Sequence, residues 1–356
     1  MKELKCFFAT FNPLIPIPDV NKHPNHKVDP IFHHMMHISK KAVFLGKNIS
    51  VDEMDISFQG QHRDKQRINY KRAGDGFLVD ALCSGGYCFS FYFRNQPPPK
   101  KWMAKKMSPL HSRVLSLFEQ LPLHTKNYDC KMDNLFMSAK FAKVALTQVP
   151  AKVMIHGVTR LNQRGVPKCV IQKQLSSKKD VQNARGTLKV AKMVGDPKCE
   201  MVAVSLYDQK PVYLLSTSCP TVEWRRKTRK LYHKALNKKV EVPFYRLNVI
   251  DDYNMHMNNV DVADQLRLQY RIHNWIRNRK WWWAMFFWSF ETSLTNCFIL
   301  YKKFHLLHNR EAKFHYEFLC LVTLSWLDTE NYSPKLWKET NQGRRCITPV
   351  NKLSPL

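Results

Sequence analysis

The stretch from Trp281 to Tyr301 constrains this chain most, because it is too apolar to stay in water and has helical periodicity. Its bulky side chains recur at the spacing of one helical face, at Trp283, Phe287, Phe290, Leu294, Phe298 and Tyr301. A membrane span is the competing interpretation, and it needs about 18 or more continuous apolar residues. Serine, glutamate, threonine and asparagine interrupt the run between positions 289 and 296. We therefore expect a helix buried in a folded domain.

Two carboxylates precede this helix. Asp261 and Asp264 are three residues apart in a segment without proline or glycine, so on a helix they face the same side, about one turn apart. That spacing suits a divalent-metal site. The alternative is that both acids occupy the first turn of a helix, where the macrodipole favours negative charge. The cations that follow favour a metal site facing phosphates, and they are Arg267, Arg271, Arg277, Arg279 and Lys280.

The segments YNMHMNNVDVADQLR and NRKWWWAMFFWSFETSLTNCFILYKK resemble the end of the catalytic domain of piggyBac-type transposases. In that family a Gly-Gly-Val-Asp-x-x-Asp-Gln block carries the last catalytic aspartate, which corresponds to Asp261. Asn258 and Asn259 stand where the family has the two glycines. Asparagine tolerates positive φ better than most residues, so the turn can survive, while close backbone approach to DNA or metal would suffer.

The charge of the chain indicates a polyanionic partner. Its 57 Lys and Arg against 28 Asp and Glu give a net charge of +29 over 356 residues, which favours nucleic acid. An anionic membrane surface is the alternative, but the sequence has no signal peptide, lipidation motif or spanning segment. We expect double-stranded DNA as partner and no membrane, and the resemblance implies a homodimer in the nucleus.

The resemblance also implies the fold and the order of domains. We expect an α/β fold with a ribonuclease-H-like core and a β-rich insertion between the second and third catalytic aspartates. The segments are a remnant of an amino-terminal DNA-binding and dimerisation region (1–47), the first part of the core (48–160), the insertion (161–250), the last part of the core (251–310) and a tail (311–356). The tail holds only Cys320 and Cys346, so a cysteine-rich zinc domain is expected to be absent from what looks like a truncated copy.

A second possible zinc site is the HHMMH segment. His33 and His37 have the i, i+4 spacing that can bind zinc on a helix, but no third ligand lies nearby in the sequence. We therefore expect no structural zinc.

The run GFLVDALCSGGYCFSFYF, residues 76–93, predicts two strands joined by a turn at Ser84-Gly85-Gly86. Asp80 interrupts the first strand, and an unpaired carboxylate there would cost several kcal/mol, so it needs a metal or a cationic partner. In ribonuclease-H-like transposases the first catalytic aspartate lies in the corresponding strand, so we assign Asp80 that role. The alternative is a broken site, because many piggyBac-like sequences carry the aspartate nearer the turn.

Two further blocks resemble the family. ISVDEMDISFQG is similar to its Val-Asp-Glu block, followed at residues 63–72 by either a phosphate-facing loop or an exposed charged loop. The block from Met132 to Ser138 is similar to Cys-Asp-Asn-Trp-Phe-Thr-Ser and follows a strand expected at 127–132, which makes Asp133 the second catalytic aspartate. The alternative for Asp133 is a turn and helix N-cap.

Residues 161–250 change to short alternating runs. TLKVAKMV, EMVAVSLY and PVYLLSTS predict antiparallel strands. The densest basic run, residues 224–239, is either a DNA-contacting arm or a solvated face, and the overall charge favours the arm. The residues of this run expected to contact DNA are Arg225, Arg226, Lys227, Arg229 and Lys230. The cations after the paired carboxylates are expected to contact DNA too, namely Arg267, Arg271, Arg277, Arg279 and Lys280.

Three carboxylates from distant segments can hold two Mg²⁺ or Mn²⁺ ions about 3.5–4 Å apart for in-line attack on a phosphodiester. The expected ligands are Asp80, Asp133 and Asp261, with Asp264 assisting. The resemblance implies a DNA transposase that nicks transposon ends, forms hairpins and joins them to a short target. The alternative is a domesticated or inactive transposon-derived DNA-binding protein, and the two interpretations diverge on whether Asp80 reaches the other carboxylates.

Overall fold

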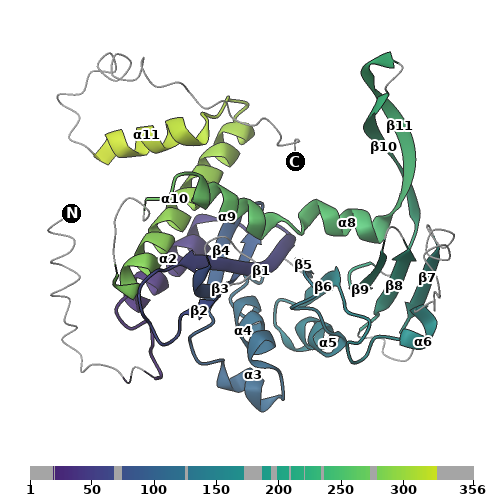
Figure 1. Ribbon diagram of the computed structural model, residues 1–356, viewed down its shortest axis with the longest axis horizontal. Helices are drawn as coiled ribbons and strands as arrows, with labels where there is room; N and C mark the ends of the chain where they lie inside the picture. The colour runs from purple at the N-terminus through teal and green to yellow at the C-terminus, as the bar shows by residue number, and fades with distance from the viewer. Residues whose placement is uncertain are drawn as a thin grey trace. The chain divides into compact units, whose positions relative to one another are not determined.

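The computed structural model describes residues 19, 21–67, 74–124, 127–171, 187–193, 199–207, 210–219, 221–233, 236–272 and 279–326 (Figure 1). The chain divides into two compact units, Met1–Leu300 and Tyr301–Leu356. Residues 1–18 and 20 of the expected amino-terminal remnant, most of the expected tail, and Arg277 lie outside the described residues.

The first unit is built on a mixed sheet of nine strands in the order β2-β3-β1-β5-β6-β9-β8-β7, with β4 paired to β3. β1 pairs antiparallel with β3 and parallel with β5, and β5 pairs parallel with β6. The strands are β1 (Asn48–Ser57), β2 (Gln66–Arg67), β3 (Asp75–Ser84), β4 (Tyr87–Phe93), β5 (Tyr128–Met132), β6 (Val153–Val158), β7 (Leu188–Lys192), β8 (Val202–Tyr207) and β9 (Pro211–Ser216).

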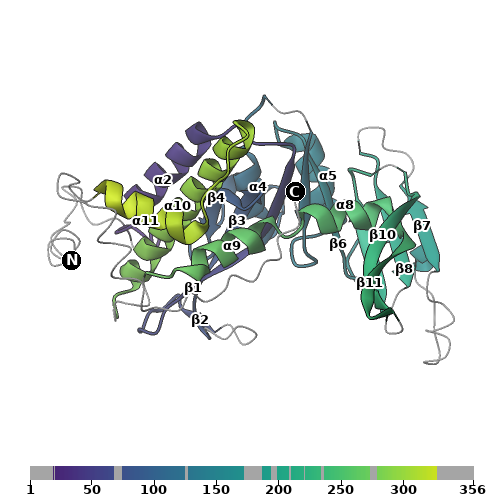
Figure 2. The ribbon, with the colours of Figure 1, turned by 90° about the horizontal axis from the view of Figure 1, so that it is seen from above.

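Helices cover both faces of this sheet. One core, around Val51, Leu82 and Cys130, includes apolar residues of α4 (Pro109–Phe118) and α5 (Ala139–Gln148). The other core, around Met54 and Ala81, includes residues of α2 (Asp29–Ala42), α9 (Asn259–Gln269) and α10 (Trp281–Leu307). Figure 2 shows α9 and α10 on their side of β1 and β3. Successive residues of β1 therefore alternate between two different environments.

Several local predictions are confirmed. The hairpin of β3 and β4 turns at Gly85 and Gly86, which have φ of +56° and +81°, a conformation that favours glycine. Ser108 caps α4 by accepting from the backbone N–H of His111, next to the proline at the first helical position. Ser138 caps α5 in the same way, so the cap of that helix is not Asp133.

The long apolar helix is buried as expected, and up to Leu300 it belongs to the first unit. Trp288 packs edge-on against Phe91 of β4, with ring centroids 4.9 Å apart. Its small polar residues are buried too, and Asn296 donates to the backbone carbonyl of Cys88 and accepts from the N–H of Cys88, both at 2.8 Å. Of the polar residues that argued against a membrane span, Asn296 pairs with β4 and Glu291 accepts from Arg267. The serine and threonine hydroxyls donate to backbone carbonyls of α10 itself. None of the helices among the described residues is both long enough and apolar enough to cross a membrane.

The region between residues 161 and 250 contains the expected strands β7, β8 and β9, and β9 pairs antiparallel with β6. The basic run forms β10 (Trp224–His233), which pairs along its whole length with β11 (Lys238–Leu247) as a separate hairpin. In Figure 1 this hairpin extends away from β7–β9. The helix α8 (Asn248–His256) leads from β11 back to the central strands and α9. The short helices are α3 (Lys100–Ala104) and α6 (Lys168–Ile171).

In the second unit the described residues are the last turns of α10 and the helix α11 (His315–Trp326). Tyr301 packs against Phe318, with ring centroids 5.1 Å apart, and its hydroxyl accepts from the backbone N–H of Lys313. Several large apolar side chains of this unit are exposed, among them Leu306, Leu307 and Phe314.

Candidate active site

Asp52 and Asp133 leave adjacent strands at the same place in the sheet. The parallel register of β1 and β5 ends with Val51 beside Met132, so the next residue on each strand is an aspartate. Parallel strands in register direct equivalent side chains to the same face. Both carboxylates therefore lie on the face that α8 and α9 cover.

Asp261 reaches the same place from α9, which packs on β1, β3 and β4. The pKa of Asp52 is raised to about 6, first by burial and then by the charges of Asp261, Glu53 and Asp133, while a hydrogen bond from the Glu53 backbone N–H opposes the rise. Carboxylates perturb one another in this way only at short range. Asp52, Asp133 and Asp261, from three segments distant in sequence, thus form one cluster, which we call the carboxylate cluster.

The donor type and charge of the carboxylate cluster fit Mg²⁺ or Mn²⁺, since these ions prefer hard oxygen ligands. The raised pKa of Asp52 comes first from burial and then from the negative charges beside it, and a bound divalent cation would offset both. As the side chains stand, no three Asp, Glu, His or Cys residues in the described part of the chain are close enough to hold an ion. The three carboxylates would have to turn toward a shared point on binding.

Asp80 is not part of this cluster, and its assignment as a metal ligand is corrected. It pairs with Glu53 across β1 and β3, whereas Asp52 pairs with Ala81, so Asp80 and Asp52 lie on opposite faces of the sheet. Its carboxylate is fully buried and accepts from Arg94 Nε at 2.7 Å and from Arg113 Nε at 2.9 Å. The charge in the strand is compensated by two guanidinium groups, with no metal needed.

Asp264 also has a cationic partner. Arg267, one turn further along α9, donates to Asp264 Oδ1 at 2.6 Å, to Glu291 Oε2 at 3.4 Å and to the carbonyl of Asp55 at 3.2 Å. Arg267 is only 3% exposed, so its prediction as a DNA contact is corrected. Arg271 lies near Arg267, Asp264 and Glu291 and is half-buried. Burial lowers the pKa of Arg271, and the positive charge of Arg267 contributes. These residues tie α9 to α10.

The wall beside the carboxylate cluster is formed by α8 and β6. Burial raises the pKa of Tyr253, and the charges of Asp133, Asp52 and Asp261 contribute, which places the phenol next to the carboxylates. Its ring lies 5.9 Å from that of His156. Burial lowers the pKa of His156 to about 4, helped by the positive charge of Lys131, so this imidazole is neutral at pH 7.

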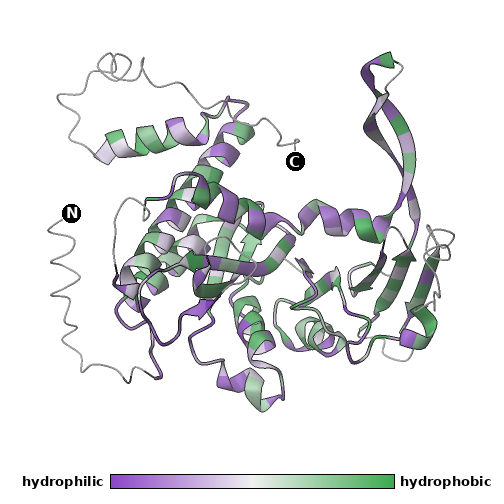
Figure 3. Ribbon diagram, viewed as in Figure 1, coloured by the Kyte–Doolittle hydropathy of each residue, from purple (hydrophilic) through white to green (hydrophobic). Residues whose placement is uncertain are grey.

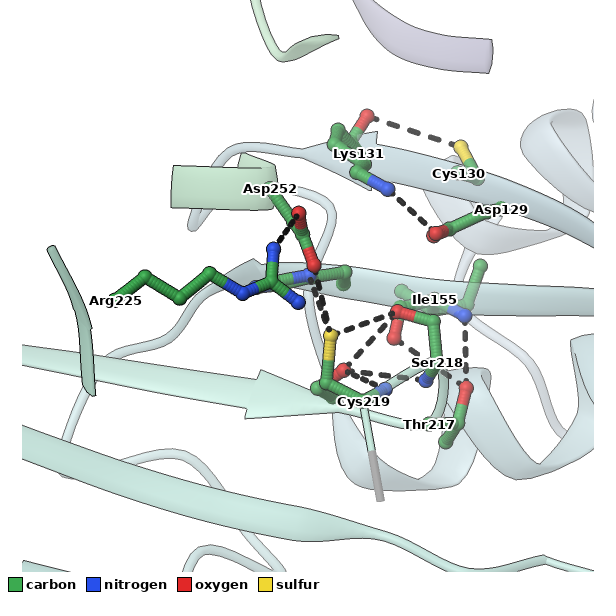
Figure 4. Close-up of polar contacts among 11 residues, drawn as sticks. Asp129, Cys130, Lys131, Ile155, Thr217, Ser218, Cys219, Arg225 and Asp252 are labelled. Atoms are coloured by element: carbon green, nitrogen blue, oxygen red, sulfur yellow. Dashed lines mark hydrogen bonds and ion pairs between the residues drawn. The ribbon is translucent and has the colours of Figure 1, made fainter. Parts of the chain in front are cut away.

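Figure 4 shows the polar contacts behind this wall. Lys131, two residues before Asp133, is 1% exposed, and its ammonium lies 2.6 Å from Asp129 Oδ2. Cys219 donates to Asp252 of α8 at 3.6 Å, and Arg225 pairs with the other oxygen of that carboxylate at 3.6 Å. Burial raises the pKa of the Cys219 thiol, which makes it a poor nucleophile. We interpret these contacts as structural, joining β9, α8 and the β10–β11 hairpin.

The remaining cations expected to contact DNA have different environments. Arg226 and Lys230 are exposed on the hairpin, and Arg279 and Lys280 are exposed before α10. Lys227 lies 2.8 Å from Asp251 of α8 and is partly used in that ion pair. The side chain of Arg229, like Arg277, lies outside the described residues.

Asp52 is the residue that sequence reasoning missed. The sequence offered a signal, because NISVDEMDIS has apolar residues on both sides of an acidic pair and could have been interpreted as a strand. Asn258 and Asn259, which stand where the family has glycines, do not need the conformational freedom of glycine. Asn258 has φ of −88° and Asn259 is helical, so neither residue has a left-handed backbone.

Comparisons with known proteins show which family the chain resembles and which fold it shares. The model of the Transposase IS4 family matches residues 12–298. The human PiggyBac transposable element-derived protein 3 is 25% identical over 309 residues, which cover 84% of this chain and 47% of that protein. The human Chimeric ERCC6-PGBD3 protein is also 25% identical over 309 residues, 26% of its length. The chain thus spans about half the length of the first relative and about a quarter of the length of the second.

A solved structure has a similar fold. It is the cryo-EM structure of the piggyBac transposase synaptic complex with hairpin DNA, with a TM-score of 0.67 at 18% identity. The match covers 96% of this chain and 66% of that one. The mixed α/β fold with a large mixed sheet is therefore that of piggyBac transposase.

Proposed function

Because the chain belongs to the Transposase IS4 family, we propose that it is a piggyBac-like DNA transposase whose carboxylate cluster cleaves phosphodiesters at transposon ends. The observation that supports the proposal is the gathering of Asp52, Asp133 and Asp261 on one face of the sheet, near enough that the charges of two of them help to raise the pKa of the third. Asp52 replaces Asp80 as the first of three acidic residues. Asp264 is proposed only to hold Arg267.

The residues of the chain would contribute as follows. Asp52, Asp133 and Asp261 would bind two Mg²⁺ or Mn²⁺ ions, which when bound activate the attacking hydroxyl and stabilise the leaving oxygen. Above pH 6 the carboxylate of Asp52 is ionised and able to act as a ligand. Tyr253 would limit access of water from the side of α8, with the neutral and fully buried His156 packed behind it.

The finer fold assignment is also part of the proposal. The strands β4-β3-β1-β5-β6 are an antiparallel set of three continued by two parallel strands, with acids on central β1 and at the end of β5. This order supports a ribonuclease-H-like core. The strands and hairpin between 161 and 250 are proposed as its β-rich insertion, although β9 extends the core sheet.

The partner is proposed to be double-stranded DNA. The net charge of +29 supports it, and so does the similar structure, which is described as a synaptic complex with hairpin DNA. We propose a homodimer that acts in the nucleus, as the resemblance implies. A transposon-derived DNA-binding protein without catalysis is the second candidate, and the observation in its favour is that the described carboxylates do not share a preassembled metal point.

The test is cleavage of transposon-end DNA by the purified chain in Mg²⁺ or Mn²⁺, with Asp133→Asn and Asp261→Asn as variants. We expect cleavage by the parent chain and none by either variant, while both still bind duplex DNA, because the substitutions remove ligand charge and keep side-chain shape. If the parent chain binds duplex DNA but does not cleave it, even with the flanking regions of a related protein supplied, the non-catalytic candidate is correct.

A further inference from the structure

The β10–β11 hairpin has two faces of different character. Alternate residues of a strand point to the same face, and residues paired across antiparallel strands share it. Arg226 pairs with Tyr245 and Tyr232 pairs with Lys239. These four residues therefore lie on one face together with Trp224 and Lys230, and we call it the outward face.

The opposite face is anchored to α8. Arg246 lies 3.6 Å from Asp251, the same carboxylate that pairs with Lys227 at 2.8 Å, and Arg225 pairs with Asp252. Arg246 also lies over the ring of Phe244, 5.1 Å from its centroid. Part of the positive charge on this face is thus neutralised within the protein. These ion pairs hold the hairpin against α8 and leave less positive charge on this face to bind a polyanion.

The outward face is exposed along its length and combines large rings with cations. Trp224, Tyr232 and Tyr245 are 47%, 58% and 65% exposed. The cations Arg226, Lys230 and Lys239 are interleaved with them, and Lys230 has one acidic neighbour, Glu241, at 3.9 Å. Figure 3 shows hydrophilic and hydrophobic residues alternating along the ribbon of the hairpin, as expected for two faces of different composition. Exposed apolar rings collected on one surface indicate a binding site rather than a solvated face.

The exposed aromatic rings of the outward face indicate whether it binds duplex or single-stranded nucleic acid. A two-stranded ribbon can enter the major groove of a duplex, but there it meets only base edges, because the base faces are stacked on one another. Aromatic side chains stack on base faces that are exposed, and cations beside them follow the backbone phosphates, which is how single strands are bound. The three exposed rings therefore favour an unpaired strand.

We propose that the outward face binds an unpaired DNA strand, with Trp224, Tyr232 and Tyr245 stacking on bases and Arg226, Lys230 and Lys239 neutralising phosphates. This site is separate from the carboxylate cluster and rests on the proposed function, since DNA is the ligand in both. It gives the basic run a more specific role than general attraction to DNA.

The test measures fluorescence anisotropy of a labelled oligothymidylate of about 20 nucleotides, longer than one such site, and of a duplex of the same length, with the full chain. Tyr245→Ala and Trp224→Ala are expected to weaken oligothymidylate binding about fivefold or more each. Tyr245→Phe keeps the ring and is the matched control, expected to bind as the parent chain does. Duplex affinity should stay within about a factor of two in all variants.

The proposal is overturned if the alanine variants bind oligothymidylate as well as the parent chain, or if they lose duplex affinity by the same factor. The second result would indicate a ribbon that reads a duplex groove. Circular dichroism of each variant checks that the exposed positions leave the fold intact. Cleavage of transposon-end DNA is measured in parallel. If the alanine variants bind oligothymidylate like the parent chain while the parent chain cleaves, this inference alone is wrong. If the parent chain neither cleaves nor binds duplex DNA, the proposed function is wrong.

Discussion

Asp52 and Asp133 stand side by side at the point where β1 and β5 stop pairing, one residue beyond Val51 and Met132. A shift of one residue in either strand would send one of these carboxylates to the opposite face of the sheet. The register of two parallel strands therefore decides whether a carboxylate cluster exists at all. α9 completes the cluster by bringing Asp261 over the same place.

Asp52 and Asp80 should respond differently to the same substitution. Asp52→Asn is expected to abolish DNA cleavage and to leave stability unchanged or raised at pH 7, because it removes a charge that burial and neighbouring acids disfavour. Asp80→Asn should destabilise the fold by about 3–5 kcal/mol, since Arg113 would keep a buried charge without this carboxylate and Arg94 would keep only Glu53. Urea unfolding and a cleavage assay on both variants check this, and each variant serves as control for the other. Equal stability of the two would contradict the assignment.

Divalent metal should stabilise the chain through the carboxylate cluster. Excess Mg²⁺ or Mn²⁺ at pH 8, where Asp52 is ionised, is expected to raise the melting temperature of the parent chain, with a gain of about 2.7 kcal/mol when the ion is at about 100 times its Kd. Asp52→Asn should gain less, because one ligand charge is missing. Differential scanning fluorimetry with and without a chelator measures the effect. An equal gain in Asp52→Asn would place the ion elsewhere.

His156 should make stability fall in mild acid. Its pKa is lowered from 6.5 to about 4 in the folded chain, so between those values the unfolded state binds more protons and the free energy of unfolding decreases as pH falls. The stability is fully present above pH 6.5, and the loss by pH 4 is about 3 kcal/mol. His156→Gln removes the titrating group, so the difference in unfolding free energy between parent and variant should change across this window. Urea unfolding curves at several pH values measure it, and parallel pH profiles would contradict the prediction.

Buried and exposed arginines near α9 should separate stability from DNA binding. Arg267→Ala is expected to destabilise the fold by about 3–5 kcal/mol, because it leaves Glu291, which is 3% exposed, without its guanidinium partner. Arg279→Ala should change stability by less than about 0.5 kcal/mol and lower duplex affinity.

The control for the Arg267→Ala and Arg279→Ala variants is the salt dependence of their affinity for duplex DNA. Loss of a phosphate contact at Arg279 should reduce the slope of log affinity against log salt by about 1. Arg267→Ala, compared under conditions where it is folded, should keep the slope of the parent chain. A reduced slope for Arg267→Ala would show that this side chain reaches DNA after all.

Local sequence determined the elements. The turn at Gly85 and Gly86, the caps at Ser108 and Ser138, and the burial of the helix from Trp281 follow from residue types and spacings within a few positions, so they could be predicted. The family blocks around Asp133 and Asp261 were readable for the same reason, because each is contiguous. The requirement that Asp80 have a partner was also evident, since a buried charge in a strand must be compensated.

Tertiary structure decided which partner each charge has. Asp80 meets Arg94 and Arg113, which are 14 and 33 residues away, while Asp52 meets Asp133 and Asp261 across strand and helix packing. Whether a carboxylate in a strand faces cations or other carboxylates depends on the face it occupies, and that face is set by cross-strand register. The sequence therefore determined that buried acids exist and that each needs compensation. Only the packing of β1 between β3 and β5 determined that Asp80 is part of the core and that Asp52 belongs to the carboxylate cluster.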